Sequence, residues 1–346
     1  MMKPKKTLQQ PQLSKKQNKI LRLINKFSGN VDITEFSPQQ ITEYNSQPLA
    51  NKALARKLLK KFPRHIETST FIIPVEDGAV TGYFYQQRGV ERQQLTNLRP
   101  LIIYFHGGGW ILGNMEIYNT TCGRLSALTH ADVLSVDYRL APQYKFPIAV
   151  EDCYNTLLWA AQGARYWKID PEQIYLAGDS AGGNLAAVVS RLARDRKGPH
   201  IAGQILLYPI TDGRLRTTSL NTFKESPTLT ARQLQFFVKN YQSEPKDILN
   251  PNFSPLLSKD HSRLPSALII TSDNDPLRED GVLYAEALKS ADTPVKHLEI
   301  KDSFHGFFPY PDAKGTDESE SAILQFIGGR PLESIELISK KELKKR

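Results

Sequence analysis

Hydrophobic positions near the start of the chain follow a helical period. Apolar residues recur every three or four positions in two segments, first at Ile20, Leu23, Ile24 and Phe27 and then at Leu54, Leu58 and Phe62. This spacing predicts two short amphipathic helices on either side of Pro48. Each helix must cover its apolar stripe, and we expect the body of the protein to do so in preference to a membrane surface.

After residue 70 the pattern changes to short runs rich in β-branched and aromatic residues. Eight runs are predicted to be strands: Phe71–Val75, Val80–Gln86, Leu101–His106, Asp132–Asp137, Ile174–Gly178, Ile201–Tyr208, Ala267–Ser272 and Val295–Ile300. Helical patterns lie between them at Tyr118–Leu128, Ile148–Gln162, Ala181–Arg194, Gly281–Lys289 and Glu318–Phe326. The later strands are apolar throughout, which is typical of strands buried on both faces of a parallel sheet.

This alternation predicts an α/β protein with an eight-stranded, mostly parallel sheet covered by helices. The turn-like sequence Glu-Asp-Gly at 76–78 indicates an antiparallel hairpin at one edge. Residues of about 211–258 contain no good strand but include a helical stretch from Thr230 to Tyr241. We interpret them as an insertion that forms a helical cap with the N-terminal helices, over the carboxyl edge of the sheet, where such sheets bind ligands.

The predicted organisation has three parts. Residues 1–69 form a basic N-terminal segment that contributes cap helices, residues 70–335 form the catalytic domain with the cap insertion, and residues 336–346 form a basic tail. Residues 1–64 carry 14 Lys and Arg against 3 Asp and Glu, so they account for the whole net charge of +9. A solvated basic face is the favoured interpretation, because no nucleic-acid-binding motif accompanies the charge. Contact with a membrane surface is possible but not favoured.

Two cysteines, Cys122 and Cys153, have no CxxC spacing, and a chain of 346 residues needs no disulfide to hold its core. The first 18 residues have no apolar stretch typical of a secretion signal, and no window of about 18 apolar residues indicates a membrane span. We therefore expect a cytoplasmic protein.

The strongest chemical motif is Gly178-Asp179-Ser180-Ala181-Gly182, a G-x-S-x-G between a predicted strand and a predicted helix. In this nucleophile elbow a sharp turn pushes the serine hydroxyl out of the sheet. The turn also leaves the amide of Ala181 free to bind an oxyanion at a helix N-terminus. The alternative is a glycine-rich turn in which Ser180 only caps the helix.

A second motif, His106-Gly107-Gly108-Gly109-Trp110, follows the strand Leu101–His106. Consecutive glycines let the backbone point several amides into one site, and we expect Gly108 and Gly109 to donate to the oxygen that becomes negative when an ester is attacked. Phosphate-binding glycine motifs are absent from the sequence. A plain loop remains the alternative.

One histidine of seven fits the role of general base. His305 falls just past the last predicted strand, where a loop can carry the imidazole to Ser180. Chain order or position in a predicted strand excludes the others, which are His65, His106, His130, His200, His261 and His297.

Three carboxylates compete to orient the histidine. Asp273, Asp275 and Asp280 all follow the strand Ala267–Ser272 closely. Asp273 is near enough to cap the strand, and Asp280 falls in the first turn of the next helix. Asp275 stands in the loop between, fixed by Pro276, and is the predicted acid.

Together these motifs resemble the hormone-sensitive-lipase-like branch of the α/β-hydrolases, which includes bacterial carboxylesterases and acetyl esterases. The matching pieces, in order, are His106-Gly-Gly-Gly-Trp, Asp137-Tyr-Arg-Leu-Ala-Pro, Phe146-Pro, Glu151-Asp152-Cys153, Gly178-Asp-Ser-Ala-Gly-Gly-Asn, Ser254-Pro-Leu-Leu, Asp275-Pro-Leu-Arg and His305-Gly-Phe. The resemblance implies the same triad and oxyanion donors and a structural role for His106, with Gly107 and Asp179 in the supporting motif. The chain departs from the family pattern in its basic N-terminal segment, at Gln143 and at Asn114.

The predicted function is a serine carboxylester hydrolase that acts on short- to medium-chain esters through an acyl-enzyme, without metal or cofactor. Its expected partner is a small-molecule ester, and it is expected to be a monomer or a homodimer. Three other hypotheses stay open: an inactive small-molecule-binding protein, a membrane-associated lipase, and an amidase. Plant hormone receptors that resemble this family have lost the catalytic histidine, whereas His305 is present.

Overall fold

A computed structural model describes residues 13–29, 31–47, 52–59, 61–89, 98–113 and 115–336. The described residues form an eight-stranded sheet in the order β1-β2-β4-β3-β5-β6-β7-β8. The expectations about Asn114, Pro48, the first 12 residues and the basic residues after 336 concern positions outside these ranges.

All eight predicted strands are present, and the predicted fold class is confirmed. The strands are β1 Ile66–Val75, β2 Gly78–Gln87, β3 Arg99–Phe105, β4 Asp132–Asp137, β5 Ile169–Asp179, β6 Gly203–Leu207, β7 Ala267–Asn274 and β8 Val295–Phe304. The block from β4 to β8 in the sheet order is parallel, and β1 and β2 form the expected antiparallel hairpin. β1 begins before the predicted Phe71, at Ile66, and the added residues 67–70 are polar and largely exposed, as an edge strand allows.

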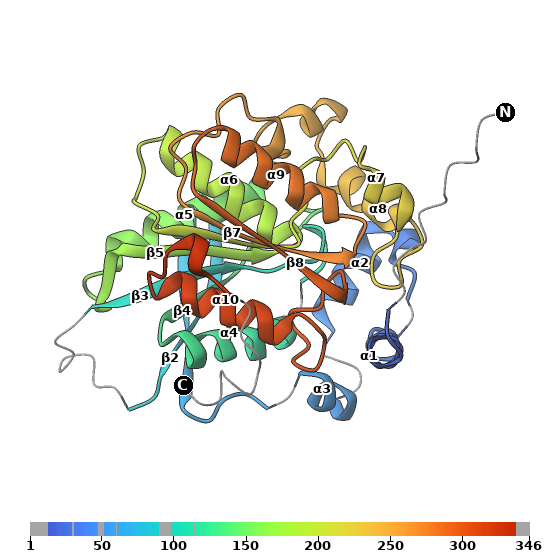
Figure 1. Cartoon of the computed structure of the whole chain (residues 1–346), viewed down its shortest axis with the longest axis horizontal. Coiled ribbons are helices and arrows are strands. Elements are labelled where there is room, and N and C mark those ends of the chain that lie inside the picture. Colours follow the sequence, from blue (N-terminus) through green and yellow to red (C-terminus); the bar gives the residue numbers. More distant parts are fainter. Residues whose placement is uncertain are drawn as a thin grey trace.

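Helices cover both faces of the sheet (Figure 1). α5 (Ile148–Gly163), α6 (Ala181–Asp195) and α9 (Arg278–Ser290) lie on one face, and α4 (Met115–Thr129) and α10 (Thr316–Ile327) lie on the other. The strand residues between them are almost completely buried, as their continuous apolar pattern predicted. This packing holds the carboxyl ends of β3, β5, β7 and β8 at one edge of the molecule.

The N-terminal segment contains one helix more than the sequence indicated. α1 (Lys15–Phe27) and α3 (Lys52–Leu59) match the two amphipathic patterns, and a 3-10 turn η1 (Ile33–Glu35) and helix α2 (Pro38–Ser46) lie between them. Ser37 and Gln40 form a capping box that starts α2. The sequence did not predict this helix because Ile41 is its one buried apolar residue, so apolar residues do not recur along it at helical spacing.

The apolar side of α1 is buried in the protein and its basic side is exposed. Ile20, Leu21, Ile24 and Phe27 pack in the same cluster as residues of α3, α4 and α10, while its four lysines and Arg22 are exposed. No helix in the described ranges is both long and apolar enough to cross a bilayer.

The insertion between β6 and β7 is helical, as expected. It contains α7 (Thr218–Thr222), α8 (Ala231–Tyr241) and two 3-10 turns, η3 (Pro245–Leu249) and η4 (Pro255–Leu257). Thr230 caps α8 through its hydroxyl and a capping box with Gln233. In Figure 1, α7 and α8 gather with α1 and α2 at the right of the view, beyond one end of the sheet.

Candidate active site

Ser180 lies between the end of β5 and the start of α6 in a strained backbone conformation. Its φ of 53° and ψ of −116° are rare for a residue with a side chain. A Cβ on Gly178 would stand 2.3 Å from the carbonyl oxygen of Gly182, and one on Gly182 would stand 1.9 Å from that of Phe105. Glycine is therefore required on both sides of the serine, as the nucleophile-elbow prediction supposed.

His305 and Asp275 come together with Ser180 although they are far apart in the sequence. The Nε2 atom of His305 lies 3.0 Å from the Ser180 Oγ, and its Nδ1 lies 2.8 Å from the Oδ2 of Asp275. A carboxylate can only accept, so Nδ1 carries the proton and Nε2 is free to accept the proton of the serine hydroxyl. Asp275 is fully buried, and the amide of Leu277 donates to its Oδ1 over 2.7 Å.

The two competing carboxylates have other partners. Asp273 accepts hydrogen bonds from the amides of Asp302 and Ser303, at 3.0 and 3.1 Å, and so shapes the end of β8 just before His305. Asp280 accepts from the amides of Thr211 and Asp212, at 2.9 and 3.1 Å, where the insertion leaves the sheet. Neither one is recorded in contact with the imidazole of His305.

Burial raises the pKa of Asp280 from 3.8 to about 7, despite the two amides that donate to it. The folded state therefore holds this proton more tightly than the unfolded state. The contribution of this proton to the free energy of unfolding is complete below pH 4 and is lost as the pH rises to about 7. In Asp280→Asn the amide oxygen can still accept both hydrogen bonds, but the side chain no longer titrates. Between pH 4 and pH 7 the free energy of unfolding should therefore fall less in the variant than in the wild type, and the two falls should differ by a few kcal/mol at most. Urea unfolding at pH 4 to 8 measures the difference, and parallel curves for both proteins would contradict it.

The loop that follows β3 has the backbone shape expected of an oxyanion hole. Gly108 and Gly109 have φ values of 112° and 63°, which favour glycine. A Cβ on Gly108 would stand 2.1 Å from the carbonyl oxygen of Leu112. No described residue is recorded as accepting a hydrogen bond from the amide of Gly108 or Gly109, so both are available to a developing oxyanion.

A buried carboxylate anchors this loop to the nucleophile elbow. Asp179 accepts hydrogen bonds from the hydroxyls of Tyr104 (2.9 Å) and Tyr118 (3.0 Å) and from the amide of Gly107 (3.0 Å). Burial raises the pKa of Asp179, and the two tyrosine hydroxyls act in the opposite direction. Since Asp179 directly precedes Ser180, this network fixes the distance between the elbow and the glycine loop. Sequence analysis placed Asp179 in a supporting motif but missed both tyrosines, which no motif marks.

His106 is buried and supports the loop without contacting the nucleophile. Its Nδ1 donates to the carbonyl of Gly107 over 2.7 Å, and its ring stacks on Tyr138 at 4.3 Å between centroids. Burial lowers the pKa of His106, which favours the neutral ring. Its own carbonyl accepts from the hydroxyl of Tyr138 over 2.7 Å. The position agrees with the structural role that the family resemblance implied.

The insertion reaches the glycine loop through one aromatic side chain. A Cβ on Gly109 would stand 2.3 Å from the ring of Phe237, so the α8 side chain lies directly against the loop. Arg232, in the first turn of α8, forms ion pairs with Asp32 and Glu35 of the N-terminal segment. The insertion and the N-terminal segment therefore meet beside the candidate oxyanion hole.

A cavity of about 550 Å³ opens between the N-terminal segment and this loop. It is lined by Phe27, Tyr44, Leu112, Ile117 and Tyr310 and by Gly107 and Gly108 of the loop, whereas Ser180 and His305 are not part of its lining. Its lining is mostly apolar with a few polar groups, as in small-molecule sites.

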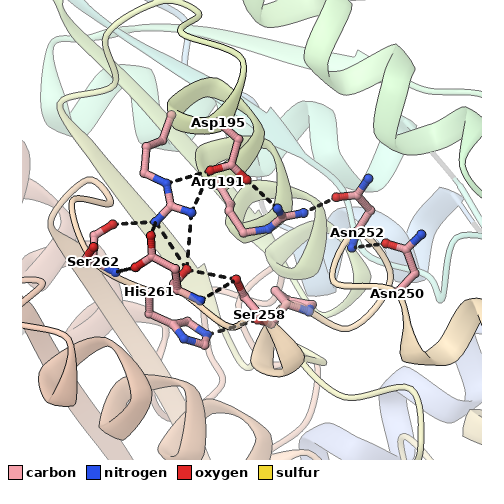
Figure 2. Close-up of polar contacts among 10 residues, drawn as sticks. Arg191, Asp195, Asn250, Asn252, Ser258, His261 and Ser262 are labelled. Carbon is pink, nitrogen blue, oxygen red and sulfur yellow. Dashed lines mark hydrogen bonds and ion pairs between the residues drawn. The ribbon is translucent and has the colours of Figure 1, made fainter.

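The return segment of the insertion is tied to the helix that begins at the nucleophile. Figure 2 shows Arg191 of α6 between Asp195 and Asn252, and the neighbouring Arg194 donates to the carbonyl of Ser262 over 2.5 Å. These bonds hold α6 and the base of the insertion together. The helix that carries Ser180 at its N-terminus is thereby fixed at its far end.

Within the described ranges, no three His, Cys, Asp or Glu side chains group as metal ligands.

A model of a protein family described as having the alpha/beta hydrolase fold matches residues 102–309. This range holds the candidate triad and the glycine loop. It leaves out the N-terminal segment that covers the cavity.

Individual proteins resemble the chain over more of its length. It is 36% identical to an arylesterase of Saccharolobus solfataricus over 81% of this chain and 88% of that protein. It is also 36% identical to the carboxylic ester hydrolase LipN of Mycobacterium tuberculosis, over 80% and 75%.

Solved structures show the same likeness. A hyperthermophilic esterase from the archaeon Pyrobaculum calidifontis superposes with a TM-score of 0.79 at 33% identity, over 94% of this chain and 100% of that one. An ester hydrolase from the metagenome of Lake Arreo, solved with a derivative of a bipyridine phosphonate, gives a TM-score of 0.80 at 28% identity, over 92% and 100%.

Proposed function

The chain belongs to this alpha/beta-hydrolase family and is a carboxylester hydrolase, and we propose that Ser180, His305 and Asp275 form its catalytic triad. The observation that carries this proposal is the pair of hydrogen-bond distances at His305, 3.0 Å to Ser180 and 2.8 Å to Asp275. In a serine hydrolase the base must reach the nucleophile and must itself be oriented by a third group.

The reaction follows from this geometry in two steps. The Ser180 oxygen attacks the ester carbonyl carbon while the Nε2 of His305 takes the hydroxyl proton, and the carbonyl oxygen becomes an oxyanion held by the amides of Gly108, Gly109 and Ala181. When the carbonyl re-forms, the ester C–O bond breaks and His305 gives its proton to the leaving alcohol. Water then attacks the acyl-enzyme by the same route and releases the carboxylic acid and Ser180.

Asp275 holds the imidazole in the tautomer that this reaction needs. Its buried carboxylate fixes the proton of His305 on Nδ1 and stabilises the imidazolium that forms during attack. No cofactor takes part in these steps.

The substrates we propose are esters with short to medium acyl chains. The cavity of about 550 Å³ beside Gly107 and Gly108 supports this, because its size and apolar walls suit a small organic group. Residues of the N-terminal segment line that cavity, and Phe237 of α8 lies against Gly109 of the loop. We also propose a cytoplasmic location, which the two buried, unpaired cysteines Cys122 and Cys153 support.

A series of p-nitrophenyl esters from acetate to palmitate tests the substrate proposal. We expect the highest kcat/KM between two and eight carbons and a fall of at least about 10-fold at palmitate, because the N-terminal segment lines the cavity beside the glycine loop and would limit the room for a long acyl chain. A p-nitroanilide of the preferred acyl group, run as a parallel, should react far more slowly. A kcat/KM that rises steadily to palmitate would contradict the proposed chain length, and faster hydrolysis of the anilide would favour an amidase.

A further inference from the structure

Asn45, near the end of α2, makes two hydrogen bonds to the backbone just after the glycine loop. Its Nδ2 donates to the carbonyl of Ile111 over 2.7 Å, and its Oδ1 accepts from the amide of Gly113 over 3.2 Å. Both ends of one amide side chain therefore hold the same short stretch of backbone. The stretch lies on the cavity side, because Asn45, Gly108 and Gly113 all line that cavity.

This stretch closes the turn that orients the candidate oxyanion hole. The amides of Ile111 and Leu112 both donate to the carbonyl oxygen of Gly108, over 3.2 and 2.8 Å. The carbonyl of Gly108 and the amide of Gly109 belong to one planar trans peptide, so they point in opposite directions. Fixing that carbonyl toward Leu112 therefore fixes the direction of the Gly109 amide.

α2 is itself held firmly enough to act as a support. Ile41 is only 1% exposed, and Gln143, from the body of the protein, donates to Thr42 and to the carbonyl of Pro38. Gln143 is one of the positions at which the sequence departs from the family pattern. The two turns of α2 that precede Asn45 thus have their own attachment to the body of the protein.

We propose that Asn45 is a positioning residue for ester hydrolysis: it locks the turn of residues 108–113 so that the Gly109 amide faces the oxyanion. This inference rests on the proposed function. By this inference the N-terminal segment, which lies outside the family match, contributes to the rate of ester hydrolysis. Asn45 does not contact the nucleophile and acts through the backbone of Ile111 and Gly113.

The test compares Asn45→Ala with Asn18→Ala. Asn18 is the matched control, since it is an asparagine of the same segment whose side chain bonds only to the backbone of Leu13 and Ser14. In Asn45→Ala we expect kcat for p-nitrophenyl butyrate to fall about 10- to 100-fold with KM changed less than about threefold, because the misplaced amide serves the transition state and not the ground state. Asn18→Ala should keep the wild-type values of both.

A second measurement separates positioning from damage to the fold. A trifluoromethyl ketone captures the Ser180 oxygen as a hemiketal whose oxygen needs the oxyanion hole, whereas the matching methyl carbinol binds the cavity without one. Asn45→Ala should weaken binding of the ketone by the same factor by which kcat falls, and it should leave binding of the carbinol unchanged. Equal weakening of both inhibitors, or an Asn45→Ala enzyme as active as Asn18→Ala, would overturn the proposal.

Asn45→Asp covers the case in which the alanine variant fails to fold. Its carboxylate can accept from Gly113 but cannot donate to Ile111, so kcat should again fall while KM is kept, and wild-type kcat in Asn45→Asp would overturn the proposal. Failure of the proposed function has a different signature, because Ser180→Ala would then remain active. An inactive Ser180→Ala with a fully active Asn45→Ala would reject only the role of Asn45.

Discussion

Replacing Ser180 with alanine is expected to lower kcat for p-nitrophenyl butyrate by about 10⁶-fold. The change removes the oxygen that forms the acyl-enzyme, and no other described hydroxyl is recorded within hydrogen-bond distance of the Nε2 of His305. Residual turnover would come from the oxyanion amides and the cavity acting on water, which leaves some acceleration over the uncatalysed reaction. The measurement is steady-state hydrolysis with enough enzyme to detect this residual turnover.

Ser190→Ala is the matched control for this variant. Ser190 lies in the same helix, α6, and is fully buried, and its hydroxyl has no recorded hydrogen-bond partner. Its loss should leave kcat within about twofold of the wild type. If Ser180→Ala kept more than one part in a thousand of the wild-type kcat while folded, Ser180 would not be the nucleophile.

Replacing Asp275 with asparagine is expected to lower kcat by about 10⁴-fold at neutral pH. The Leu277 amide donates to one oxygen of Asp275 and His305 faces the other. In the variant the amide oxygen can take the Leu277 bond, which turns the NH₂ group toward Nδ1. His305 would then carry its proton on Nε2 and could not accept the proton of Ser180.

Asp280→Asn makes the same chemical change at a neighbouring buried acid and is the control here. Asp280 binds the backbone of the insertion and is not in contact with His305. Its kcat should stay within about threefold of the wild type at pH 7. A loss in Asp280→Asn as large as in Asp275→Asn would mean that the acid was wrongly chosen from the three candidates.

Much of the fold could be predicted because its signals are local. Strands such as Leu101–Phe105 are buried on both faces and therefore apolar without alternation, which a sequence displays directly. The elbow at Ser180 needs glycine at Gly178 and Gly182, since any Cβ there would overlap backbone atoms. Chain order and the positions of the predicted strands then narrowed the choice of histidine to His305.

The residues that sequence analysis missed are those defined by contacts between distant segments. Asn45 is an ordinary polar residue of a nine-residue helix, and only folding places it against Ile111. Tyr118 falls on a helix whose pattern does not show that its hydroxyl meets Asp179. In the sequence Phe237 is only one apolar position of an amphipathic helix, although its ring lies against Gly109. Such contacts have no periodic signature, so the sequence alone does not reveal them.

Covalent labelling of the wild type with a p-nitrophenyl alkylphosphonate tests the central claim most directly. The phosphonate phosphorus takes the place of the ester carbon, so the nucleophile displaces p-nitrophenol and keeps the phosphonyl group. We predict one phosphonyl group per chain, found by peptide mass spectrometry on Ser180, with one equivalent of p-nitrophenol released and none from Ser180→Ala. Stoichiometric labelling of another residue, or equal labelling of Ser180→Ala, would contradict the account.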